Sequence, residues 1–172
     1  FNATNETDRH KHRKPVTISG RTMGTFYNVS VIPFNNKTIK RDQLQQQIDA
    51  RLQEINQRMS TYIANSELSR INQAQAHKWV EISEETAAVI GTAQQISTIT
   101  DGAFDITVGN IVNLWGFGPD INLYAIPDDA RIQSTLALSG YQKLEVQFDP
   151  PRAKKHNDSL YLDLSGIAKG YG

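Results

Sequence analysis

A helical period runs through Arg41-Asp-Gln-Leu-Gln-Gln-Gln-Ile-Asp-Ala-Arg-Leu-Gln-Glu-Ile-Asn-Gln-Arg-Met59. Its apolar residues lie four, four, three and four positions apart, at Leu44, Ile48, Leu52, Ile55 and Met59. This spacing places them on one face of a helix, while Gln, Asp, Arg and Glu fill the other face. The stretch therefore predicts an amphipathic helix that covers a sheet.

The residues before this helix predict two paired strands. Residues 16–19 and 25–32 are rich in β-branched and aromatic side chains, and Gly20 and Gly24 between them are typical of a turn or bulge. Residues 1–15 hold a single apolar side chain of any size, so burial cannot offset the entropy cost of ordering them. We expect 1–15 to be a disordered tether and 16–172 to be one domain.

The residues after this helix predict further helices and strands. Ser66 and Ser83 each precede acidic residues, a helix-start pattern. The helix after Ser83 carries Ala88, Val89, Ala93, Ile96 and Ile99 and ends at Asp101-Gly102, with Gly102 at the left-handed position. Pro127 begins another helix that ends at Gly140, with Ile132, Leu136 and Leu138 facing inward.

Residues 78–82, 142–148 and 160–164 predict strands, and residues 149–159 predict a charged hairpin loop between the last two. The fold class is then α+β, with a mixed or antiparallel sheet covered by amphipathic helices.

The composition excludes several functional classes. Eighteen basic and eighteen acidic residues cancel to zero net charge, which argues against nucleic-acid binding along the surface. No apolar run approaches the ~20 residues of a membrane span. The sequence has no cysteine, so disulfides, thiolate catalysis and cysteine metal sites are excluded.

Two stretches invite a ligand-binding interpretation. Trp115-Gly116-Phe117-Gly118 offers two flat rings on a bare backbone, suited either to a planar ligand or to packing of the loop on its own core. Residues 163–172 form a strand-to-helix turn with Lys169 as a point charge. Gly166-Ile-Ala-Lys-Gly170 is only part of a phosphate-binding loop pattern, and by itself this stretch favours a plain β-to-α turn.

Four motifs together carry a family resemblance. In chain order they are Thr22-Met-Gly-Thr25; Met59-Ser-Thr-Tyr62 with Ser66-Glu-Leu-Ser-Arg-Ile-Asn72; Gly102-Ala-Phe-Asp-Ile-Thr107 with Trp115-Gly-Phe-Gly118; and Leu162-Asp-Leu-Ser-Gly-Ile-Ala-Lys-Gly170. The chain resembles the N-terminal half of the ApbE family, bacterial FAD:protein FMN transferases with a T-fold-related architecture. The resemblance covers roughly residues 19–172.

The resemblance implies a Mg2+-dependent enzyme that binds FAD, splits its pyrophosphate and transfers FMN to a threonine or serine of an acceptor protein. Two alternatives remain, a Mg2+-dependent FAD pyrophosphatase that releases FMN and AMP, and a flavin-binding or trafficking module without turnover. Carried over by motif, the expected FAD contacts are Met23, Tyr62, Ala103, Phe104, Asp105, Asp163 and Lys169. The Gly166 main-chain oxygen would bind the metal, and the sequence identifies no catalytic residue.

The resemblance also implies a second half, absent after residue 172, that supplies the side-chain metal ligands. We therefore expect residues 1–172 alone to be inactive. Family members are typically periplasmic lipoproteins of the inner membrane, so the resemblance implies an N-terminal lipid anchor that this chain lacks.

Overall fold

The computed structural model describes residues 14–33, 38–119 and 126–172. These residues fall into two compact units, residues 1–53 and residues 54–172. Most of the predicted tether lies outside the described residues. The two units are described separately.

The first unit contains a β-hairpin. Strands β1 (Val16–Thr22) and β2 (Thr25–Val31) pair antiparallel from Val16↔Val31 to Thr22↔Thr25. Met23 and Gly24 both have positive φ, 49° and 70°, as a two-residue turn matched to the twist of a hairpin requires. The prediction of two paired strands is confirmed.

Helix α1 (Arg41–Met59) begins in this unit and contacts both strands there. The Arg41 Nε donates to Thr17 O at 3.2 Å, and Tyr27 Oη donates to Asp49 Oδ1 at 2.5 Å. The helix occupies the residues that its apolar period predicts, and the sheet beside its first half is the β1–β2 hairpin.

The second unit begins with the end of α1 and continues with α2 (Glu67–Gln73) and α3 (Glu84–Ile99). Ser66 Oγ accepts from Ser69 N at 2.9 Å and Ser83 Oγ accepts from Thr86 N at 3.2 Å, so both serines cap the helices they were expected to start. These caps confirm the two predicted helix starts.

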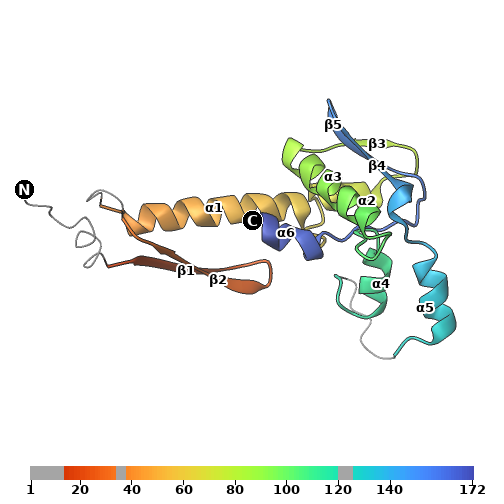
Figure 1. Ribbon diagram of the computed structural model, residues 1–172, viewed down its shortest axis with the longest axis horizontal. Coiled ribbons are helices and arrows are strands. Elements are labelled where there is room, and N and C mark those ends of the chain that lie inside the picture. Colours follow the sequence, from red (N-terminus) through yellow and green to blue (C-terminus); the bar gives the residue numbers. More distant parts are fainter. Residues whose placement is uncertain (1–13, 34–37, 120–125) are drawn as a thin grey trace, which may run out of the picture. The chain divides into compact units, whose positions relative to one another are not determined.

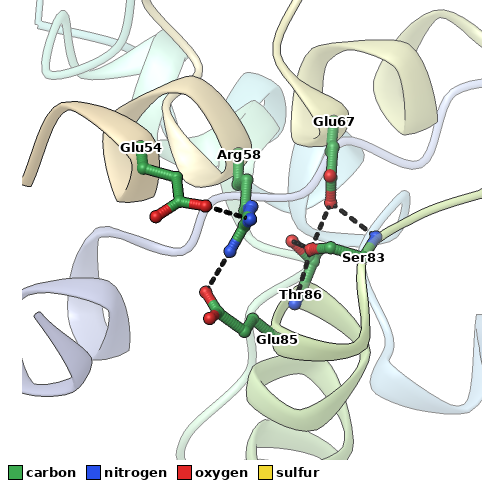
Figure 2. Close-up of polar contacts among 6 residues, drawn as sticks. All are labelled: Glu54, Arg58, Glu67, Ser83, Glu85 and Thr86. Atoms are coloured by element: carbon green, nitrogen blue, oxygen red, sulfur yellow. Dashed lines mark hydrogen bonds and ion pairs between the residues drawn. The ribbon is translucent and has the colours of Figure 1, made fainter. Parts of the chain in front are cut away.

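Charged side chains tie the start of α3 to its neighbours (Figure 2). Arg58, near the end of α1, pairs with both Glu54 and Glu85. The Glu67 carboxylate accepts from both the backbone N and the Oγ of Ser83 at 2.9 Å. The ends of α1, α2 and α3 are thereby held together.

A three-stranded antiparallel sheet has the order β3-β5-β4, from β3 (Trp79–Glu81), β4 (Leu144–Phe148) and β5 (Pro151–Lys155). Helix α3 packs against β4 and β5 and runs beside this sheet in Figure 1. Val89, Ile90 and Ala93 of α3 are buried, as is Ala153 of β5. This contact is one part of the core of the unit.

The prediction of a charged loop at 149–159 is wrong, because residues 151–155 form β5 in the middle of the sheet. The charges are accommodated by their surroundings. Arg152 and Lys154 each lie 4.6 Å from the centre of the Trp79 ring, and Lys155 is buried with its ammonium group hydrogen-bonded. Long basic side chains can line a strand when their stems pack on apolar atoms.

The prediction of a strand at 160–164 is wrong as well. Residues 160–164 form no strand and have only an isolated bridge between Val108 and Tyr161. The burial does alternate along the segment, because Leu160, Leu162 and Leu164 are buried and the residues between them are less so. Side chains and loop atoms, rather than a neighbouring strand, bond its backbone.

The remaining helices are α4 (Gly109–Leu114), α5 (Asp129–Leu136) and α6 (Ser165–Tyr171). The expectation that Leu136 faces inward is wrong, because α5 buries none of its residues and Leu136 is exposed. In α3, Ala88 and Ile99 are also exposed.

The end of α3 also differs from its prediction. Asp101, with φ 51°, takes the first left-handed position, and Gly102, with φ 80°, follows it. Gly102 N donates to Ser97 O at 2.8 Å and Asp101 N donates to Thr98 O at 3.3 Å, the bond pair of a Schellman motif. Aspartate fills the expected glycine position because its short polar side chain tolerates this conformation.

The α+β fold class is confirmed, and both sheets of the described residues are antiparallel. Among those same residues, no helix combines the length and the apolar character needed to cross a bilayer.

Candidate functional site

A pocket of about 390 Å3 lies in the second unit between residues 102–117 and residues 163–166. Most of the predicted FAD contacts of this unit line it, namely Ala103, Phe104, Asp105 and Asp163, and so does Gly166, the predicted metal ligand. Apolar side chains complete the walls, from Ile106, Val108, Val112 and Phe117. The structure thus brings together two motifs that are about sixty residues apart in sequence.

Asp105 is fixed by its own loop. Its Oδ1 accepts from both the backbone N and the Oγ1 of Thr107, at 2.8 and 2.7 Å. Thr107 is fully buried, and its Oγ1 also accepts from Gly140 N at 2.8 Å. The carboxylate is therefore held by one oxygen, and within the described part of the chain no donor bonds its Oδ2.

Asp163 is held in a similar way on the facing wall. Its backbone N donates to Ile106 O at 2.8 Å, which joins the two walls of the pocket. Its Oδ1 accepts from Ser165 N at 2.6 Å, at the start of α6. Each wall thus presents one carboxylate that a single oxygen anchors to the backbone.

Phe104 and Gly166 lie against each other across the pocket. A Cβ atom on Gly166 would lie 3.4 Å from Cε2 of Phe104, so the ring borders the bare backbone of the first turn of α6. Phe104 N donates to the Thr100 Oγ1 at 3.2 Å, which ties this residue to the end of α3. The pocket therefore combines a flat ring with exposed peptide groups.

Lys169 lies on α6, three residues after Gly166 and on the same side of the helix. Its side chain is exposed and is not part of the pocket lining. Met23 belongs to the turn between β1 and β2 in the first unit, whereas the pocket is built from the second unit.

Tyr62 reaches the rim of the pocket through a hydrogen bond. Its Oη donates to Phe117 O at 2.8 Å, and its side chain is exposed. Phe117, which lines the pocket, is 75% exposed and Trp115 is 44% exposed. The aromatic rings of this loop are accessible, which favours the planar-ligand interpretation over packing on the core.

The loop that carries these rings has a defined backbone. Phe117 N donates to Val112 O at 3.0 Å, and Gly116 has a φ of 76°. At Gly118 a Cβ atom would lie 1.6 Å from the Asn113 Oδ1, so any side chain there would displace the Asn113 carboxamide. Glycine is therefore favoured at 116 by the positive φ and at 118 by the lack of space for a Cβ atom.

Metal-binding chemistry is only partly present. Across residues 14–33, 38–119 and 126–172, no three His, Asp or Glu side chains come together as a metal site. The Asp163 carboxylate and the Gly166 carbonyl are oxygen donors of the kind Mg2+ prefers, and both residues line the pocket. They fit part of a Mg2+ shell.

Sequence reasoning missed several residues of this region. Thr107 could have been found, because Asp-x-Thr is the spacing at which a carboxylate bonds the backbone two residues on. Ser165 lines the pocket beside Asp163 and lies within a quoted motif. Lys155 and Asn72 support the segment before Asp163, and neither spacing nor composition indicates this.

A family model described as the ApbE family matches residues 23–172. Two curated relatives are each called "FAD:protein FMN transferase". The Vibrio cholerae protein is 40% identical over 166 residues, which cover 94% of this chain and 48% of the relative. The Haemophilus influenzae protein is 38% identical over 165 residues, with 94% and 48% covered.

The fold also matches solved structures. A structure described as "Flavin Transferase ApbE from Vibrio cholerae" superposes with a TM-score of 0.86 at 39% identity, covering 93% of this chain and 51% of that chain. The chain spans about half the length of the curated relatives it matches.

Proposed function

Because the chain belongs to the ApbE family, we propose that it is the N-terminal part of a Mg2+-dependent FAD:protein FMN transferase. The observation that carries this proposal is the pocket lined by Phe104, Asp105, Asp163 and Gly166, which unites the motifs expected to bind FAD. The names of relatives that are close to 40% identical support the same reaction.

The chemistry of the pocket suits a flavin nucleotide. The flavin ring is flat and apolar on its faces but carries an imide N–H at its edge, and the nucleotide carries hydroxyl and amine donors. Phe104, Val112 and Phe117 supply apolar surface, and the free oxygens of Asp105 and Asp163 would accept from such donors.

The proposed reaction replaces the phosphoanhydride bond of FAD with a phosphate ester bond to the acceptor. The hydroxyl oxygen of an acceptor threonine or serine forms a bond to the FMN phosphorus as the bond from that phosphorus to the bridging oxygen breaks. AMP leaves with the bridging oxygen, and the hydroxyl proton passes to a base. No residue of this chain is assigned as that base.

Mg2+ would neutralise charge on the pyrophosphate oxygens as AMP leaves. Asp163 and Gly166 would supply part of its ligand set. Lys169, one turn along the helix from Gly166, would add positive charge beside the phosphates. Tyr62 would position the loop of Phe117 through its hydrogen bond, and Met23 remains a predicted FAD contact.

The transferase proposal also includes an acceptor protein and further ligands of the metal. The acceptor is a protein with a target threonine or serine, and the remaining ligands of the metal come from a part of the protein beyond residues 1–172. We place the protein in the periplasm, held to the inner membrane by an N-terminal lipid.

The test incubates the full-length protein with FAD, Mg2+ and a peptide that carries the target threonine, with a Thr→Val peptide and EDTA as controls. We expect the peptide to gain the mass of an FMN phosphoryl group while AMP forms in equal amount, only with threonine and only with Mg2+. Residues 1–172 alone should release no AMP.

Two other outcomes would contradict the transferase proposal. Free FMN with AMP and an unmodified peptide would identify an FAD pyrophosphatase. Bound FAD without any AMP would identify a flavin-binding module.

A further inference from the structure

The segment 158–163 starts in a turn at Asp158 and Ser159, ends at the pocket residue Asp163, and does not lie in a sheet. Its backbone is bonded at almost every residue. Asn110 Nδ2 donates to Ser159 O at 2.6 Å, and Gly109 N donates to Tyr161 O at 3.0 Å. The conformation of the chain that leads to Asp163 therefore depends on groups outside the segment.

Asn72 makes the closest of these contacts to Asp163. Its Nδ2 donates to Leu162 O at 3.0 Å, and its Oδ1 accepts from Leu162 N at 2.8 Å. A carboxamide presents one donor and one acceptor side by side, as a peptide group does. Asn72 thus replaces a neighbouring strand at the residue directly before Asp163.

The Asn72 side chain is itself held in place. It lies in the last turn of α2, whose first turn is capped by Ser66. Lys155 Nζ donates to Asn72 O at 2.7 Å, which satisfies a carbonyl that a helix end leaves unpaired. The same ammonium group donates to Asp158 O at 3.1 Å and Leu160 O at 3.2 Å. Lys155 therefore connects α2 to the start of the segment.

Buried and pocket-facing residues alternate at the end of the segment, so the constraint on Leu162 affects the pocket. Leu162 and Leu164 are fully buried, whereas Asp163 between them is half-buried and lines the pocket. A rotation of the Leu162 peptide would move the Asp163 carboxylate and its backbone bond to Ile106.

We propose that Asn72 is a positioning residue, which fixes the peptide of Leu162 and thereby sets the position of the Asp163 carboxylate in the pocket. Asn72 does not line the pocket and acts only through Leu162. The choice of FAD as the ligand rests on the proposed function, whereas the constraint on Leu162 does not.

The first test measures FAD affinity of the full-length protein by flavin fluorescence. We expect Asn72→Ala to weaken binding about fivefold or more, which corresponds to the loss of ~1 kcal/mol from one or two hydrogen bonds. Asn110→Ala is the matched control, because it removes a bond to the same segment at Ser159, farther from the pocket. It should bind FAD like the wild type.

A second control separates positioning from loss of stability. Val89 is buried in α3 and does not line the pocket, so Val89→Ala should lower the melting temperature without changing FAD affinity. If Val89→Ala and Asn72→Ala weaken binding equally at equal stability, or if Asn72→Ala binds like the wild type, the proposal is overturned.

Amide hydrogen exchange tests the constraint without any ligand. We expect the Leu162 amide to exchange faster in Asn72→Ala than in the wild type, with little change at Leu162 in Asn110→Ala. Unchanged exchange at Leu162 would overturn the proposal. Failure of the wild type to bind FAD would refute the proposed function alone, because the exchange measurement still decides the role of Asn72.

Discussion

At the scale of single residues, we expect Asp105 to combine two roles, because its bonds within the described residues use only one carboxylate oxygen. Oδ1 holds Thr107, and this bond keeps the loop of the first pocket wall in place. Oδ2 is left for a donor on the ligand. We therefore expect Oδ1 to support the loop and Oδ2 to contact the flavin.

We expect Asp105→Ala in the full-length protein to weaken FAD binding by ~1–3 kcal/mol, because a partly buried ligand group loses its partner. Asp105→Asn keeps an acceptor for Thr107, so it should also weaken binding while it leaves the melting temperature close to that of the wild type. Flavin fluorescence titration measures both variants. The matched control is Asp129→Asn, an exposed carboxylate of α5 outside the pocket.

The assignment of Asp105 fails if Asp105→Asn keeps wild-type affinity, or if Asp129→Asn loses as much affinity as the Asp105 variants.

At the scale of elements, the sequence predicted what local chemistry determines. The helices capped by Ser66 and Ser83 begin where the cap pattern places them, and the β1–β2 hairpin turns at its glycine. The apolar spacing of α1 is that of the observed helix. These features depend on residues within one turn or one hairpin of each other.

Prediction from the sequence failed where groups distant along the chain determine the conformation. β5 forms although it is rich in charge, because Trp79 comes from another strand to lie against Arg152 and Lys154. The segment 160–164 alternates like a strand, but Asn72 occupies the place of its partner. For the site, the motifs predicted most residues of the pocket wall, yet the support from Lys155 and Asn72 exists only in the folded chain.

Lys155 of β5 makes stability depend on pH. Burial of its ammonium group lowers the pKa of Lys155 below the ordinary lysine value of 10.5, although the charge of Asp158 opposes this shift. Between the lowered pKa and 10.5 the unfolded chain binds the proton more often than the folded chain does. Stability therefore rises with pH through this window, and the contribution is lost as the pH falls.

We expect Lys155→Met to unfold more easily than the wild type, because it leaves three carbonyl groups without their donor. The difference in unfolding free energy should widen as the pH rises toward 10.5. Urea denaturation at several alkaline pH values measures it. A difference that stays constant or narrows would contradict the lowered pKa.

At the scale of the whole molecule, the pocket that we propose for FAD has both of its walls in this chain, whereas its oxygen donors fit only part of a Mg2+ shell. The two carboxylates and the aromatic rim belong to the second unit. The chain spans about half the length of its curated relatives. We therefore expect activity to require residues beyond those present here.

We propose that FAD binds in the pocket between residues 102–117 and 163–166. A crystal structure of the full-length protein with FAD and Mg2+ tests this binding site. We expect the nucleotide to contact Ala103, Phe104, Asp105 and Asp163, with the metal near Gly166. FAD bound elsewhere on the protein, with this pocket free of any part of the nucleotide, would contradict it.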